Sequence, residues 1–154
     1  MDRSAHTAST RAQQVPDVVR AGAPGFQVRS VALLGEGPDN LAYEVNGELV
    51  VRVSKEPDPA RRAGLISAEA RLLAAVAGIS PLPVPEPLCT DREHGCWAHA
   101  KIPGVPLLDI PQPQRLAHAP AIGTALGGFL AALHAAPPGQ KAQLAGPDEV
   151  PMAA

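Results

Sequence analysis

The chain has 154 residues, a formal net charge of −2 and a sequence pI of about 6.2. This balance provides no basic field, so neither nucleic acid nor an anionic membrane surface is expected as a partner. No run of about 18 apolar residues occurs, which argues against a membrane-spanning helix, and residues 1–14 contain no apolar signal-peptide core. We therefore expect a cytoplasmic protein.

The composition predicts a single loop-rich domain whose core is built mostly from Ala, Val and Leu. Eighteen prolines and fourteen glycines accompany only two Phe, one Tyr and one Trp. Cys89 and Cys96 are the two cysteines, and without a secretory signal both are expected to remain reduced thiols rather than to form a disulfide.

The first 24 residues are expected to form a disordered leader that contains at most a short helix. Residues 1–14 are polar and show no apolar period, whereas residues 16–20 could form one or two helical turns before Gly22 and Pro24. Residues 26–34 then alternate imperfectly and predict a first strand. This strand leads into a glycine turn that contains Gly35 and Gly37.

A β-hairpin follows the glycine turn, with strands over residues 40–45 and 48–54. Asn46-Gly47 separates two runs of strand-forming residues and supplies the positive φ angles of a type I′ turn. Counting outward from a two-residue turn pairs Val45 with Glu48 and Leu41 with Arg52. The expected sheet face thus carries Leu41, Tyr43, Val45, Val50 and Arg52.

A helix is predicted from Pro59 to Ala77, since Asp58 is a good N-cap, proline suits the first helical position and Gly78 ends the apolar pattern. Its expected apolar stripe consists of Leu65, Leu72, Leu73 and Val76. Glu69 lies on the same stripe. A buried carboxylate needs a partner, because burying it unpaired would cost several kcal/mol in order of magnitude.

The remaining elements follow from proline and glycine positions. Residues 79–87 hold four prolines and predict an extended connector, and residues 87–90 and 96–102 predict two further strands joined by a loop over 91–95. Residues 103–106 resemble a hinge. After Pro120 a helical stripe recurs, with no later periodic segment to cover it: Ile122, Leu126, Phe129, Leu130 and Leu133.

The order of these parts resembles the aminoglycoside phosphotransferase family, whose members are small-molecule kinases related to protein kinases. The resemblance rests on six segments over about residues 25–136, which are 35–43, 49–53, 69–73, 84–87, 102–107 and 130–134. It implies an α+β fold: a kinase-like small lobe with about five antiparallel strands and one crossing helix. The small lobe would cover residues 25–103, and residues 104–136 would supply a hinge and the first helix of a helical lobe.

The resemblance also implies a nucleotide site, with ATP or GTP as the cofactor. Glycines let backbone N–H groups approach phosphate oxygens, a cation offsets phosphate charge and a helix carboxylate orients that cation. The family pattern places Arg52 as the cation and Glu69 as its partner. The other implied nucleotide-binding residues are Gly35, Gly37, Asp39 and Asn40 in the turn, and His99, Ala100, Lys101 and Ile102 at the adenine.

The family's catalytic aspartate and metal ligands follow a Leu-x-x-Leu-His helix, here residues 130–134. After His134 the carboxylates are Asp148 and Glu149, and no asparagine occurs. We therefore expect residues 1–154 to contain no catalytic residue and no metal ligand, to be truncated before the catalytic loop and to be inactive alone. Mg²⁺ and a small-molecule acceptor would bind only a full-length form, and residues 137–154 are expected to be a disordered tail.

Other interpretations of the same residues stay open. Arg52 and Glu69 could form an ordinary ion pair between sheet and helix, and Gly35 and Gly37 could form a plain tight turn. Trp97 is expected in the core. The chain could also be a non-catalytic remnant or a protein-interaction module that self-associates through the uncovered helix 121–135.

Overall fold

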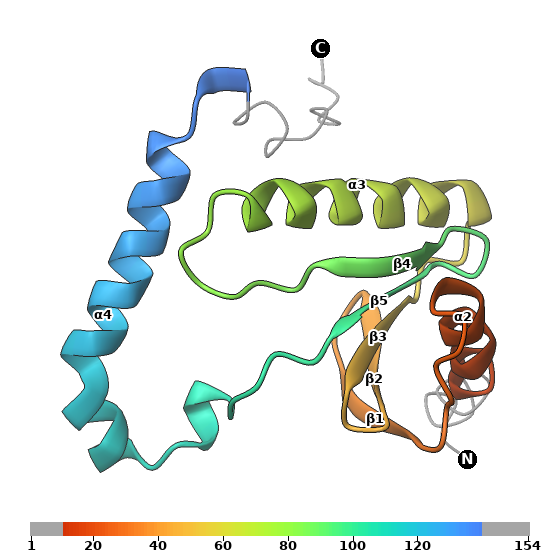
Figure 1. Ribbon diagram of the computed structural model, residues 1–154, viewed down its shortest axis with the longest axis horizontal. Helices are drawn as coiled ribbons and strands as arrows, with labels where there is room; N and C mark the ends of the chain where they lie inside the picture. Colours follow the sequence, from red (N-terminus) through yellow and green to blue (C-terminus); the bar gives the residue numbers. More distant parts are fainter. Residues whose placement is uncertain (1–10, 140–154) are drawn as a thin grey trace.

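The computed structural model describes residues 11–139, and in that part five strands form one antiparallel sheet with the order β1-β2-β3-β5-β4 (Figure 1). The α+β class with a five-stranded antiparallel sheet is thereby confirmed. The strands are β1 (Val31–Glu36), β2 (Asn40–Val45), β3 (Leu49–Ser54), β4 (Pro87–Asp91) and β5 (Cys96–Ala100). The helices are α2 (Val15–Gly22), α3 (Pro59–Ala77), the 3-10 turn η1 (Leu107–Asp109) and α4 (Gln112–Ala135).

The helix α2 belongs to the core and is not part of a leader. Val15, Val18 and Val19 are buried. They form one apolar cluster with every second side chain of β2, β3 and β5. The helix approaches β4 so closely that a Cβ on Gly22 would lie 2.1 Å from the Cβ of Cys89. The predicted leader residues 1–10 lie outside the described part of the chain.

The register of the β2–β3 hairpin differs by one residue from the prediction. Asn46 and Gly47 do have positive φ angles, of 56° and 77°, but Val45 pairs with Leu49 and Leu41 with Val53. The loop therefore has three residues, 46–48. Because side chains alternate along a strand, Arg52 lies on the face opposite Leu41, Tyr43 and Val45, together with Val50.

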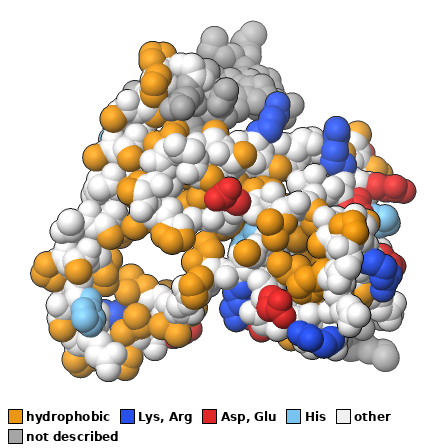
Figure 2. Space-filling model, in the orientation of Figure 1, with side chains coloured by type: hydrophobic (Ala, Val, Ile, Leu, Met, Phe, Trp, Pro, Cys, Tyr) orange, Lys and Arg blue, Asp and Glu red, His pale blue; other side chains and the backbone are white. Residues whose placement is uncertain are grey.

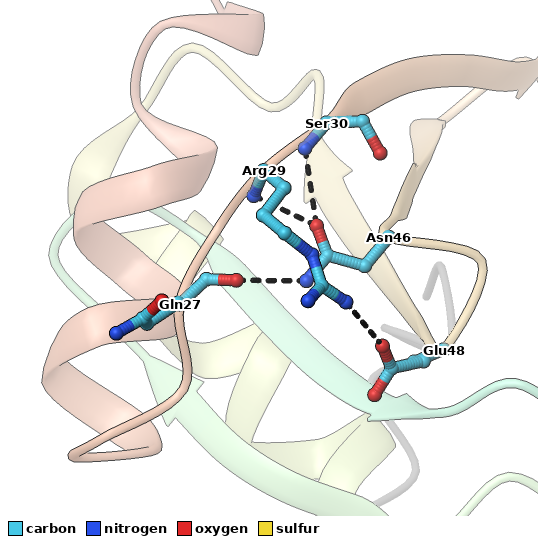
Figure 3. Close-up of polar contacts among 5 residues, drawn as sticks. All are labelled: Gln27, Arg29, Ser30, Asn46 and Glu48. Carbon is cyan, nitrogen blue, oxygen red and sulfur yellow. Dashed lines mark hydrogen bonds and ion pairs between the residues drawn. The ribbon is translucent and has the colours of Figure 1, made fainter.

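The side chain of Asn46 explains why β1 starts later than expected. Its Oδ1 accepts hydrogen bonds from the N–H groups of Arg29 and Ser30, at 2.8 and 3.0 Å, and its Nδ2 donates to the Gln27 carbonyl at 2.8 Å (Figure 3). Residues 27–30 are thus held by this side chain and by the backbone bond from the Asn46 N–H to the Ser30 carbonyl, at 3.1 Å, instead of by a continuous strand ladder. The strand predicted over 26–34 begins at Val31 and continues through Gly35 to Glu36, with an irregular register between Leu33 and Gly35.

The helix α3 has the predicted bounds and the predicted cap, in which the Asp58 carboxylate accepts from the Arg61 N–H at 2.8 Å. Its packed stripe is rotated by one position, because Ile66 is buried whereas Leu65 and Leu72 are 49% and 38% exposed. Glu69 keeps its place on the packed stripe. The helix lies along β4 in Figure 1 and contacts both β4 and β5.

Both cysteines are free thiols, as expected. Cys96 is buried in the apolar cluster, and this burial raises the pKa of its thiol to about 12. Burial also raises the pKa of the Cys89 thiol, which lies on β4. Neither thiol is poised as a nucleophile, because the thiolate is the reactive form.

The helix α4 begins at Gln112, upstream of the start expected after Pro120. Pro111 and Pro113 occupy the helix start, where a missing N–H costs little, and Pro120 lies inside the helix. None of its residues is buried, and Leu126 and Leu130 are each 52% exposed. Figure 2 shows hydrophobic side chains along α4 and open space between this helix and the sheet.

Length and hydropathy do not exclude α4 as a membrane-spanning helix, contrary to the sequence-based expectation. Over residues 11–139 it is the one helix that meets both criteria, with a mean hydropathy of 1.5 over its most apolar window. A single such helix is weak evidence for a membrane segment. The predicted disordered tail lies almost entirely beyond the last described residue, Gly139.

Candidate functional site

The centre of the candidate site is Arg52 on β3. Its Nη1 lies 2.7 Å from Oε1 of Glu69 on α3, and the two side chains are 36% and 27% exposed. Strand pairing places Arg52 opposite Trp97 of β5, and the guanidinium carbon lies 5.5 Å from the centre of the indole ring. This geometry fits a cation–π contact. Arg52 is therefore oriented from two sides while its side chain keeps access to solvent.

His99 continues the same sheet face toward the end of β5. It pairs with Val50, is 7% exposed, and its ring centre lies 5.0 Å from that of Trp97. Burial lowers the pKa of His99 below 6.5, and the nearby positive charge of Arg52 lowers it further, against the opposing effect of a backbone hydrogen bond. His99 is consequently neutral at pH 7 and above.

The neutral state fixes which nitrogen of His99 carries the proton. Nδ1 lies 2.8 Å from the carbonyl oxygen of Ala100. Since a carbonyl only accepts, Nδ1 must donate, and Nε2 is then an acceptor. The residues that follow are exposed: Ala100, Lys101 and Ile102. Lys101 is anchored at both ends, because its N–H donates to the Glu48 carbonyl at 2.8 Å and its Nζ pairs with the Glu44 carboxylate.

The glycine turn between β1 and β2 is open to solvent. The N–H of Gly37 donates to the Asn40 carbonyl at 2.8 Å, and the Asp39 carbonyl accepts from the Lys55 N–H at 2.8 Å. A Cβ on Gly35 would meet nothing within 4 Å, and one on Gly37 would meet only the Asn40 carbonyl, at 3.7 Å. Neither glycine has a left-handed φ. The fold itself does not require glycine at these positions, so the space above them is available to a ligand.

The structure thus brings Arg52, Glu69 and His99 together on one face of the sheet and places the glycines at the end of the neighbouring hairpin. Trp97 is fully buried, as expected for a core residue, and it also lies between the cation and the histidine. Lys55 was missed, although it follows β3 directly and the hairpin places it beside Asp39. Over residues 11–139 no three His, Cys, Asp or Glu side chains gather as a metal site would require.

A shallow pocket lies elsewhere, between α2 and β4. Its lining includes Val18, Gly22, Cys89 and Asp91. These residues lie on or beside the α2 side of the sheet, and Arg52 lies on the other face. This pocket does not contain the paired cation and carboxylate, so it is not the candidate site.

Similarity to known proteins identifies the family. The family model described as the phosphotransferase enzyme family matches residues 30–152. No curated protein matches. Among solved structures, the GDP and kanamycin complex of APH(2")-IIIa has 24% identity and a TM-score of 0.62, covering 86% of this chain and 45% of the other.

Two other solved structures are similar in fold. The GDP complex of wild-type aminoglycoside 2′-phosphotransferase-IIIa has 22% identity and a TM-score of 0.63, and the match covers 87% of this chain and 45% of the other. Macrolide 2′-phosphotransferase type I has 22% identity and a TM-score of 0.58, with 90% and 47% covered. The chain therefore spans less than half the length of these structures, and its sheet and helices have the kinase-like fold of their small lobe. The chain belongs to the phosphotransferase enzyme family.

Proposed function

We propose that this chain is the nucleotide-binding lobe of an ATP- or GTP-dependent small-molecule phosphotransferase. The observation that carries the proposal is the pair of Arg52 and Glu69, which holds a partly exposed cation on the sheet face that also carries His99. A cation in this position can offset phosphate charge. The glycine turn at the neighbouring hairpin leaves open space in which phosphates could lie.

The described residues fit a nucleotide in two parts. Arg52 and the turn with Gly35, Gly37, Asp39 and Asn40 would hold the phosphates, with Glu69 orienting the arginine. His99 and the exposed residues Ala100, Lys101 and Ile102 would line the purine. The nucleotide supplies the phosphoryl group. In support, solved structures of similar fold are described as complexes with GDP or with ATP.

We propose that Mg²⁺ binds only a full-length form, because this ion needs one or two carboxylates beside the nucleotide phosphates and the resemblance places those carboxylates after the Leu-x-x-Leu-His helix. We also propose that residues 1–154 alone transfer no phosphoryl group. After His134 the sequence offers Asp148 and Glu149 as carboxylates and no asparagine. A phosphate-release and acceptor-transfer assay with Mg²⁺ and ATP tests this, and turnover above the buffer rate would contradict it.

A titration with fluorescent ATP and GTP analogues tests nucleotide binding. We expect weak binding by the wild type and a loss of about tenfold in Arg52→Ala, which corresponds to about 1.4 kcal/mol. Arg29→Ala is the matched control, because Arg29 is also paired with a glutamate but lies at the hairpin loop. Equal affinities of wild type and Arg52→Ala would overturn the proposal.

The exposed surface of α4 favours a second candidate function, self-association of the chain as a non-catalytic module. The helix has no buried residue, and its exposed large side chains include Leu116, Leu126 and Leu130. Sedimentation velocity of the wild type and of Leu126→Glu tests this function. A wild type that is monomeric at all concentrations and does not bind a hydrophobic dye would overturn it. The cytoplasmic location and the absence of a nucleic-acid partner stay predictions.

A further inference from the structure

Lys55 ties the end of β3 to the turn between β1 and β2. Its ammonium group donates to the carbonyl of Gly37 at 2.7 Å and pairs with the carboxylate of Glu36 at 2.5 Å. Its backbone N–H donates to the carbonyl of Asp39 at 2.8 Å. One residue therefore contacts three of the four residues in the segment 36–39.

These contacts matter because the turn has no apolar packing of its own. All side chains from Ala32 to Asp39 are exposed. The backbone bond from Gly37 to Asn40 lies within the turn and does not attach it to the rest of the sheet. By contrast, the Lys55 side chain is 29% exposed, so its contacts are only partly screened by water.

Lys55 also reduces the negative charge of the turn. The turn carries Glu36 and Asp39, and unpaired carboxylates would repel an anionic ligand. The ammonium of Lys55 compensates Glu36 directly. Lys55 follows Arg52 by three residues along the same strand end, so the segment that carries the arginine also attaches the turn.

We propose that Lys55 is a positioning residue for the nucleotide phosphates. It holds the turn 36–39 in the conformation that receives them, and it compensates the charge of Glu36. This role rests on the proposed function of the lobe as a nucleotide-binding unit. The purine end of the ligand is not involved, because His99 and Ala100 lie at the other end of β5, away from the turn.

The test compares ATP, ADP and adenosine as ligands of wild type, Lys55→Met and Lys55→Arg. Methionine keeps the length of the side chain and the backbone bond to Asp39 but removes the charge. We expect ATP and ADP affinity to fall about tenfold in Lys55→Met, as for loss of a charge-assisted contact, with adenosine affinity unchanged. Lys55→Arg should retain most of the affinity. Arg29→Met removes an equal charge from the segment 27–30, beside the hairpin loop, and should behave as the wild type.

Amide hydrogen exchange of the nucleotide-free chain separates this proposal from the proposed function. Exchange at Gly37 and at Lys55 should be at least several-fold faster in Lys55→Met than in wild type and unchanged in Arg29→Met. Unchanged exchange at both amides would overturn the positioning role, whatever the nucleotide results. Faster exchange with unaltered ATP affinity would also overturn it. A wild type that binds neither ATP nor adenosine would instead overturn the proposed function.

Discussion

The guanidinium of Arg52 lies 2.7 Å from the carboxylate of Glu69 and joins strand β3 to helix α3. The pair is neither fully buried nor freely exposed, so it escapes part of the desolvation cost of a buried ion pair and is less screened than a surface pair. The face of Trp97 lies 5.5 Å from the guanidinium and restricts its motion. The cation is thus held in place, which would lower the entropy cost of binding the proposed nucleotide.

A double-mutant cycle measures this pairing. We expect Arg52→Met and Glu69→Gln to be coupled by about 1 kcal/mol in the free energy of unfolding, at the upper end of exposed pairs. Urea denaturation of the wild type, the two single variants and the double variant gives this value. The same cycle on Arg20 and Asp17, whose side chains are both exposed, should give a smaller coupling energy. Additive effects at Arg52 and Glu69 would show that the contact does not stabilise the fold.

The hairpin residue Asn46 combines a left-handed backbone with three side-chain hydrogen bonds to residues 27–30 (Figure 3). We expect Asn46→Ala to lower the free energy of unfolding by about 2 kcal/mol or more, because it removes the bonds and adds backbone strain. Asn46→Gly keeps the backbone conformation and loses only the bonds, so it should be less harmful. Thermal and urea unfolding provide the measurement. An Asn46→Ala variant as stable as Asn46→Gly would contradict the assigned backbone strain.

Local sequence signals predicted α3 and the central hairpin well, but they missed the packing of α2 in the core and the early start of α4. The Asp58 cap, Pro59 and Gly78 predicted α3 with its correct bounds, and the Asn46-Gly47 turn was predicted with the correct signs of φ. The register was nevertheless wrong by one residue, because Glu48 belongs to the loop and Leu49 pairs with Val45. One extra loop residue moves every later side chain to the other face.

The residues of the candidate site that follow from the order of sequence segments were predictable. The contacts that depend on how far a side chain extends, or on which strands pair, were not. The resemblance to a kinase-like lobe indicated Arg52 and Glu69 as partners, and the structure pairs them. The contacts of Lys55 need the closed turn and a flexible side chain that crosses to it. The face of Trp97 next to Arg52 follows from the β3–β5 pairing, a long-range contact that no local pattern contains.

The close contact of α2 with β4 makes Gly22 sensitive to substitution. A Cβ at this position would lie 2.1 Å from Cys89 Cβ and 2.3 Å from its Sγ. We expect Gly22→Ala to lower the free energy of unfolding by about 2 kcal/mol, within the range for overpacked cores. Gly123→Ala is the control, since a Cβ on Gly123 in α4 meets nothing within 4 Å, and this variant should gain helix stability. Chemical denaturation of both variants tests the contrast, and a neutral Gly22→Ala would show that α2 and β4 separate without cost.

Neutral His99 makes the stability of the lobe depend on pH. Folding lowers its pKa below 6.5 through burial and the charge of Arg52. Well above pH 6.5 the histidine is neutral in both the folded and the unfolded chain, so it contributes no pH dependence there. As the pH falls below 6.5, the unfolded chain takes up the proton first, and the free energy of unfolding decreases until the folded histidine is protonated as well.

The variant His99→Gln isolates this contribution from that of the other titrating groups, because glutamine can still donate to the Ala100 carbonyl but does not titrate. Urea unfolding at pH 7.5 and at pH 5 gives the loss of stability for each protein. We expect the wild type to lose more stability than His99→Gln over this interval. The control is His118→Gln, because His118 is exposed on α4. This control should lose as much stability as the wild type. Equal losses in the free energy of unfolding by wild type and His99→Gln would show that His99 keeps its ordinary pKa in the folded chain. The histidine that donates to the Ala100 carbonyl would then take up a proton near neutral pH.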